Sequence, residues 1–193
     1  RRKPVFISLE LAPYFYALSE NYGDPAHDYL QLYEDGLLSQ AAKSIYEVLL
    51  AGPLDTANLR RATHMTSQAS NSPFERGLTE LQRDFKILPV GVAETGAWRY
   101  SFIYDLVHRF YPQLPSQARP ISRRAARCEL LARYIESVGA ATVADASKVF
   151  QWDRGDLVAA LLTLVAEGRL HGGYRVEGER DMHFVIPSLL AMR

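Results

Sequence analysis

Residues 72–104, SPFERGLTELQRDFKILPVGVAETGAWRYSFIY, contain the pattern that decides the fold. Apolar side chains recur at three- and four-residue spacing up to Leu81 and beyond, which predicts a helix. Ser72 is expected to cap this helix, with Pro73 at its first position. Two β-type runs then flank a glycine-containing turn, which is typical of a β-hairpin. A helix followed directly by a hairpin is the C-terminal half of a winged helix.

The segment before this stretch supplies the other helices that the fold needs. Ser39 can cap a helix whose apolar face ends before Pro53. Asp55 or Thr56 can cap a short second helix, and a polar loop leads from there to the third. Two short helices are also expected within residues 1–38. Three helices and a hairpin complete a winged helix-turn-helix.

The same order of elements occurs again toward the C-terminus. Ser122, Thr142 and Asp153 each precede an apolar helical pattern, and a second hairpin follows Gly168. Three pairs of residues align the two copies at an offset of 82 or 83 positions. These pairs are Leu81 with Leu164, Ile87 with Leu170, and Phe102 with Phe184. An internal repeat is strong evidence for architecture, and it indicates two related domains.

The predicted fold class is therefore mainly helical with small β-hairpins, an α+β tandem of winged helix-turn-helix domains preceded by short N-terminal helices. We assign residues 1–38 to the N-terminal helical segment and residues 39–111 to the first winged-helix domain. Residues 112–121 form a proline-rich linker, which is expected to be stiff and extended, and residues 122–193 form the second winged-helix domain.

Composition narrows the possible functions. The formal net charge is zero, so a DNA-binding function requires positive charge that is concentrated locally. The single cysteine, Cys128, excludes an internal disulfide and fits a reducing cytoplasm. The histidines are scattered, so neither a metal nor another cofactor is expected. No apolar run reaches the roughly 18 residues of a membrane-spanning helix, so no membrane partner is expected.

Four separated blocks of sequence resemble a known superfamily. They are the start of the second helix (residues 52–60), the end of the third helix (78–84), the first wing (91–100) and a helix junction in the second copy (133–142). In this order they resemble the winged-helix superfamily that contains the crosslink-repair DNA glycosylases of the AlkZ type, and most closely its short relatives. The resemblance implies a scaffold that faces DNA, with DNA repair or regulation as the setting.

One element of that superfamily has no counterpart in this chain. Its glycosylases carry a Gln-hydrophobic-Gln or Gln-hydrophobic-Asp element that positions the attacking water. Gln31-Leu32-Tyr33 matches only the first residue of that element, so no catalytic residue is assigned. A glycosylase whose catalytic element lies before Arg1 stays as an alternative hypothesis.

The first copy offers two groups of candidate DNA contacts. Arg76, Gln82 and Arg83 lie at non-core positions of the third helix, from which they can reach base edges or phosphates. Arg60 and Arg61, together with Lys43, form a second, weaker basic patch. Neighbouring acidic residues dilute the charge of the third helix. We expect this copy to contact DNA, duplex or damaged and branched, through these side chains.

Two more groups complete the candidate set. Trp98 and Arg99 at the wing can enter a minor groove or stack on an exposed base, although a tryptophan at the base of a wing is more often a core residue. Arg123, Arg124 and Arg127 share a face of the first helix of the second copy, where arginines outnumber acids. They form either a ridge that contacts phosphates or a face whose arginines are solvated or paired with acids of the other domain.

Two classes of function fit these observations. The first is a DNA-binding module. The second is a protein-interaction scaffold, because tandem winged helices also grip other proteins, and a neutral net charge with acidic third helices suits that use. A continuous positive surface favours DNA, whereas a broken charge pattern with an exposed apolar patch favours a protein partner.

Overall fold

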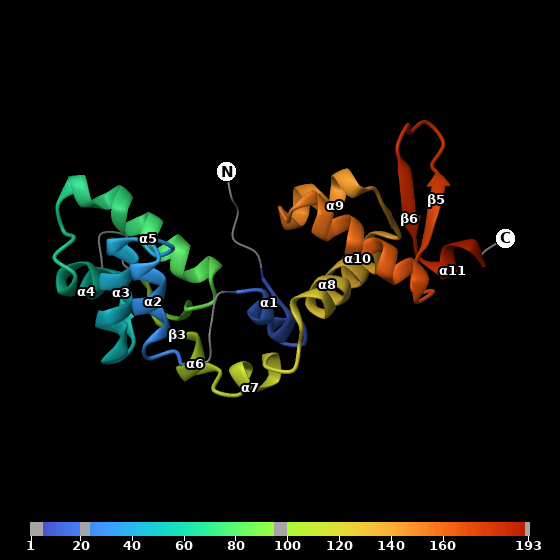
Figure 1. The fold of residues 1–193 in the computed structure, drawn as a ribbon. Coiled ribbons are helices and arrows are strands. Elements are labelled where there is room, and N and C mark those ends of the chain that lie inside the picture. Colours follow the sequence, from blue (N-terminus) through green and yellow to red (C-terminus); the bar gives the residue numbers. More distant parts are fainter. Residues whose placement is uncertain (1–5, 20–23, 95–99, 192–193) are drawn as a thin grey trace. The chain divides into compact units, whose positions relative to one another are not determined.

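The computed structural model describes residues 6–19, 24–94 and 100–191. They form two compact units, each a group of helices with a three-stranded antiparallel sheet (Figure 1). The first unit runs from Ser19 to Arg119, and the second combines the chain up to Leu18 with the chain from Pro120 onward. Each unit contains three helices followed by a hairpin, so the predicted α+β fold of tandem winged helices is confirmed.

In the first unit, α3, α4 and α5 are the three helices of the winged helix, and β2 and β3 form its wing. The sheet has the order β1-β3-β2, so β3 is its central strand. The elements are α2 (Asp28–Glu34), α3 (Gln40–Leu50), β1 (Leu54–Asp55), α4 (Thr56–Ala62), the 3₁₀ turn η1 (Gln68–Ser70), α5 (Asn71–Arg83), β2 (Ile87–Ala93), β3 (Ser101–Leu106), α6 (Val107–Phe110) and α7 (Leu114–Ala118).

Local capping and apolar periodicity explain these helices. The Ser39 hydroxyl accepts a hydrogen bond from the amide of Ala42 and caps α3, as predicted. The Asp55 carboxylate accepts from the amides of Ala57 and Asn58 and caps α4. The inner faces of the three helices meet in one core, whose fully buried residues include Ile45, Leu49, Leu59, Phe74 and Leu81.

Helix α5 approaches α3 closely at Gly77, which is buried. A Cβ atom at this position would lie 3.0 Å from the backbone nitrogen of Ala42 and 3.2 Å from the backbone carbon of Ala41. It would also lie 3.1 Å from Cδ1 of Ile45. The absence of a side chain at Gly77 therefore sets the distance at which the third helix packs on the first.

The second unit repeats this plan. Helix α1 packs against α8, and the sheet has the order β4-β6-β5, which matches the order of the first sheet. The elements are α1 (Ala12–Leu18), α8 (Arg123–Val138), β4 (Ala140–Ala141), α9 (Val143–Phe150), α10 (Arg154–Ala166), β5 (His171–Arg175), β6 (Met182–Val185) and α11 (Pro187–Leu190).

Two of the residue pairs that aligned the copies occupy equivalent places. Leu81 in α5 and Leu164 in α10 are fully buried, in helices of the same length of 13 residues. Ile87 and Leu170 are both 1% exposed and stand where the chain enters each wing. The third helix and the start of the wing thus keep a constant offset between the copies.

The third pair, Phe102 with Phe184, is wrong. Leu54 of β1 pairs with Tyr104, and Ala141 of β4 pairs with Phe184, so Tyr104 is the counterpart of Phe184. Tyr104 is buried, whereas 50% of Phe102 is exposed. The error arises because the second wing is shorter than the first. Fewer residues lie between Leu170 and Phe184 than between Ile87 and Tyr104, so the offset that aligns the third helices does not hold in the returning strand.

The linker differs from its predicted extended form. Residues 112–121 contain α7, in which Leu114 and Ala118 are buried. Pro115 lies in the first turn of this helix, where its missing amide hydrogen costs no helical hydrogen bond. Among the described residues, no helix is long and apolar enough to cross a membrane.

Candidate nucleic-acid interface

The turn between α4 and α5 of the first unit is built from polar side chains. The 3₁₀ turn η1 begins after Ser67, whose hydroxyl accepts from the amide of Ser70 at 3.3 Å. Helix α5 starts at Asn71, one residue before the predicted cap Ser72, so that prediction was wrong. Ser70 precedes the helix without making a side-chain cap, because η1 runs directly into α5.

Arg60 is fixed at the start of α5. Its guanidinium donates a hydrogen bond to the side-chain oxygen of Asn71 and lies 4.5 Å from the ring centroid of Phe74. Phe74 is fully buried, so the ring is a rigid platform for the cation. Arg61 is exposed, and both arginines belong to the last turn of α4. Positive charge and the N-terminus of a 13-residue helix therefore coincide here.

The outer face of α5 is polar. Arg76 is exposed and its Nε donates to the backbone oxygen of Ser72 at 3.4 Å. Gln82 donates its amide to the carbonyl of Leu78 in the same helix at 3.0 Å. Arg83 forms an ion pair with Asp84 at 2.8 Å, and this hydrogen bond raises the pKa of the guanidinium.

The structure brings only some of the predicted residues of the first copy together. Arg60 adjoins the first turn of α5, and Arg76 lies on the next turn. Arg83 is in the last turn, about 16 Å along the helix axis from Ser72 at 1.5 Å per residue. The N-terminal half of α5 therefore holds the cations that can act together.

The wing of the first unit exposes apolar side chains that the sequence did not single out. Val92 and Phe102 face each other across β2 and β3, with 58% and 50% of their surfaces exposed. Tyr100 is 63% exposed beside the start of β3. The predicted contacts Trp98 and Arg99 lie outside the described residues. A period of two places Phe102 on the same side of β3 as the buried Tyr104, so strand alternation does not predict that Phe102 is exposed.

The arginines of α8 have partners within their own unit. Arg127 forms an ion pair with Asp156 at 2.7 Å, and its guanidinium carbon lies 6.0 Å from the ring centroid of Trp152. Arg124 donates to the hydroxyl of Thr163 at 3.0 Å. Arg123 is exposed at the first position of the helix. One of the three candidates on this face, Arg127, is thus paired with an acid, but this acid belongs to its own unit and not, as the alternative interpretation had expected, to the other domain.

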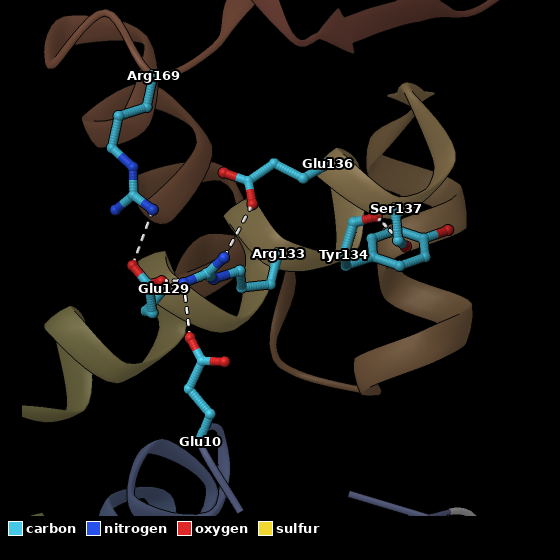
Figure 2. Close-up of polar contacts among 7 residues, drawn as sticks. All are labelled: Glu10, Glu129, Arg133, Tyr134, Glu136, Ser137 and Arg169. Atoms are coloured by element: carbon cyan, nitrogen blue, oxygen red, sulfur yellow. Dashed lines mark hydrogen bonds and ion pairs between the residues drawn. The ribbon is translucent and has the colours of Figure 1, made fainter. Parts of the chain in front are cut away.

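Further along α8, Glu129 is the centre of an ionic network (Figure 2). It accepts from Arg133 at 3.0 Å and from Arg169 at 2.8 Å, and Arg133 also reaches Glu10 at 2.9 Å. Burial opposes ionisation of Glu129, but the hydrogen bonds from the two arginines outweigh it and lower the pKa of the carboxyl below its ordinary value. The network ties the segment before α1 to α8, and it neutralises Arg133.

The two units differ in their balance of charge. Acidic residues outnumber basic ones in the first unit, and basic residues outnumber acidic ones in the second. Any anion site on the first unit therefore depends on local placement of cations. Within the described ranges, no three histidine, cysteine or acidic side chains lie together in a way that could hold a metal ion.

Comparison with known proteins gives one match. The family model described as AlkZ related matches residues 1–151. This match takes in the first unit and continues through α8 and α9, and it stops before α10. No curated protein and no solved structure matches the chain.

Proposed function

The chain belongs to the AlkZ-related family, and from this premise we propose that it is a DNA-binding protein that holds the phosphate backbone at the α4–α5 turn of its first unit. The relation to the crosslink-repair glycosylases suggests DNA as the ligand class. The observation that carries the proposal is the fixed position of Arg60, between Phe74 and Asn71 at the start of α5.

Three features of this turn suit a phosphate. The dipole of the 13-residue helix α5 adds partial positive charge at its N-terminus, where the amide of Asn71 donates to the carbonyl of Gln68 in the preceding 3₁₀ turn. Arg60 is held in place before a ligand arrives, so little side-chain entropy is lost on binding. Arg61 is exposed beside it, and Ser67 and Ser70 add hydroxyl groups. Each group favours an anion, and a duplex offers anions at regular spacing.

The groove contacts follow from the same placement. A phosphate at the start of the third helix orients the outer face of that helix toward the base edges, with Arg76 and Thr79 on the groove side. Tyr100 and Phe102 extend the surface at the wing, where aromatic side chains can stack on an unpaired base. Branched or damaged DNA is the proposed preference, because its bases are accessible for stacking.

Arg123 and Arg124 of the second unit are a secondary proposed contact. Both are exposed at the start of α8, whereas Arg127 is committed to Asp156. Replacing Arg123, Arg124 and Arg127 together with alanine is expected to flatten the salt dependence of DNA binding. An unchanged slope would remove this face from the proposal and leave the first unit as the DNA-binding surface.

Fluorescence anisotropy with a labelled duplex and a forked duplex, across a salt titration, tests the proposal. Arg61→Ala is expected to weaken binding and to reduce the slope of log K against log salt by about 0.9, the value for one phosphate contact. Lys148→Ala is the matched control, because it removes one exposed cation from α9 of the second unit. Absence of binding at low salt, or equal slopes for the two variants, would refute the proposal.

A further inference from the structure

Helix α8 is buried on two opposite faces. One face carries Cys128, Leu131 and Ile135, which belong to the core of the second unit. Ala126 and Leu130 are also buried, at 0% and 3% exposure, but they lie outside that core. At about 100° per residue, these two residues point away from the core face. A second element must therefore cover the outer face of α8.

The N-terminal helix α1 is that element. It packs against α8 (Figure 1), and its Tyr16 is 7% exposed. Arg133 follows Leu130 by three residues, so it lies on the same face of α8. It forms an ion pair at 2.9 Å with Glu10, two residues before α1 (Figure 2). Helix α1 thus covers a face of α8 that the core does not use.

The order of the chain gives this contact a second effect. Helix α1 precedes the first unit in sequence and α8 follows it, so the first unit, from Ser19 to Arg119, lies between two segments of the second unit. While α1 is docked on α8, both ends of the first unit are connected to the second unit. When α1 leaves α8, only the connection after Arg119 remains.

Three features make this contact easier to open than the core. Helix α1 has seven residues, too few for a stable helix in isolation, so its helical form depends on docking. Arg133 also pairs with Glu129 at 3.0 Å and with Glu136 at 3.6 Å, so it keeps two acidic partners when Glu10 leaves. The residues of the second core belong to the chain from α8 onward, so release of α1 leaves that core intact.

We infer that α1 is a releasable latch, which opens and closes on α8 while the rest of the second unit stays folded. Its opening changes the number of connections between the units from two to one. No residue of the latch is among the proposed DNA contacts, so the latch and DNA binding can succeed or fail separately. The consequence for DNA rests on the proposed function: the second connection raises the effective concentration of one unit's DNA contacts once the other unit is bound.

Labelling of thiols in the full chain with a maleimide tests the latch. The natural Cys128 is buried on the core face of α8 and is expected to react only when the unit unfolds. Leu130→Cys, made together with Cys128→Ala, places a thiol on the face under α1. Each rate is divided by the rate of the same chain unfolded in urea. The Leu130→Cys thiol is expected to react at least about tenfold faster than Cys128, because local opening needs less free energy than unfolding. Equal corrected rates would overturn the inference, since α1 would then leave α8 only when the whole unit unfolds.

Changes in the N-terminal segment test what keeps the latch closed. Glu10→Gln is expected to raise the labelling rate of the Leu130→Cys thiol by about two- to fivefold, the effect of losing an exposed ion pair. Tyr16→Ala is expected to raise it by at least about tenfold, because it removes a buried aromatic ring. Both changes should leave the rate of Cys128 unaltered. Glu177→Gln is the matched control, because it removes an exposed acid from the second wing, and no change in either rate is expected. An equal rise in the Cys128 rate would mean that the whole unit is destabilised, and it would overturn the latch.

Discussion

Replacing Gly77 with alanine separates helix propensity from helix packing in the third helix of the first unit. In an exposed helix, alanine is favoured over glycine by about 1 kcal/mol. At Gly77 the added Cβ would lie 3.0 Å from the nitrogen of Ala42 and 3.2 Å from the carbon of Ala41, both backbone atoms of α3. Backbone atoms cannot rotate away as a side-chain tip can, so α5 must move or strain must remain.

The magnitude follows from these two opposing effects. Overpacking of a core costs about 1–3 kcal/mol, and contact with backbone places this site toward the upper end. After the gain in propensity, Gly77→Ala is expected to lower the free energy of unfolding of the first unit by about 1–2 kcal/mol. At a urea dependence of about 1–2 kcal/mol per molar, the midpoint falls by about 1 M. Gly77→Val is expected to lower it further.

The assay must follow one unit at a time, because a chain of two units need not unfold in one step. The chain has two tryptophans, and Trp152 lies in the second unit. With Trp152→Phe in every variant, the fluorescence of Trp98 reports on the first unit. Thr79→Ala is the control, because Thr79 is exposed on the same helix and its hydroxyl donates to the backbone oxygen of Glu75 within that helix. A Gly77→Ala midpoint at or above that of the parent would refute the packing argument.

Three further changes test other parts of the structure. Thr142→Ala removes the capping box of α9 and is expected to lower the free energy of unfolding of the second unit by about 1 kcal/mol, measured by urea unfolding. Thr142→Ser should keep most of the stability of the parent. Equal midpoints for the two variants would contradict the capping role of Thr142. Arg109→Ala leaves the buried Asp105 carboxylate without its cation and is expected to lower the free energy of unfolding of the first unit by about 2 kcal/mol. Adding Asp105→Asn to this variant should restore part of the loss. A loss of less than half that size would mean that solvent replaces the arginine. Glu129 has a lowered pKa in the folded state, so its contribution to stability is complete above the ordinary pKa of 4.5 and is lost as the pH falls through the pKa of the folded state. Glu129→Gln is therefore expected to flatten the dependence of stability on pH below about pH 5. Parallel pH profiles of the two proteins would exclude this network as the source of the pH dependence.

The features that the sequence predicted correctly depend on chemistry within a few residues. Ser39, Ser122, Thr142 and Asp153 cap helices because each side chain reaches a backbone amide two or three positions ahead. The prediction failed at Ser72, because α5 begins one residue earlier, at Asn71. The amide of Asn71 already donates to the carbonyl of Gln68 in the preceding 3₁₀ turn. Such a turn has no strong sequence signal, so the boundary could not be located from the residues alone.

The candidate site was less predictable because its geometry depends on residues far apart in sequence. The sequence placed Arg124 and Arg127 on one helix face, but their partners Thr163 and Asp156 belong to another helix. The position of Arg60 over a buried ring likewise follows from the way α4 crosses the start of α5. Helical periodicity gives the direction of a side chain, and only the packed structure gives what that side chain meets.

The two third helices show where the copies have diverged. At the offset of 83 that aligns Leu81 with Leu164, the exposed residues Arg76 and Thr79 of α5 correspond to Ala159 and Leu162 of α10. Both helices bury equivalent inner faces, so the demands of the core are the same in the two copies. The outer positions carry no such demand, and polar residues at them fold equally well, as α5 demonstrates. A leucine that is 59% exposed on α10 therefore contributes little to folding, and the two outer faces have diverged in chemistry, since the face of α5 is polar and that of α10 is apolar.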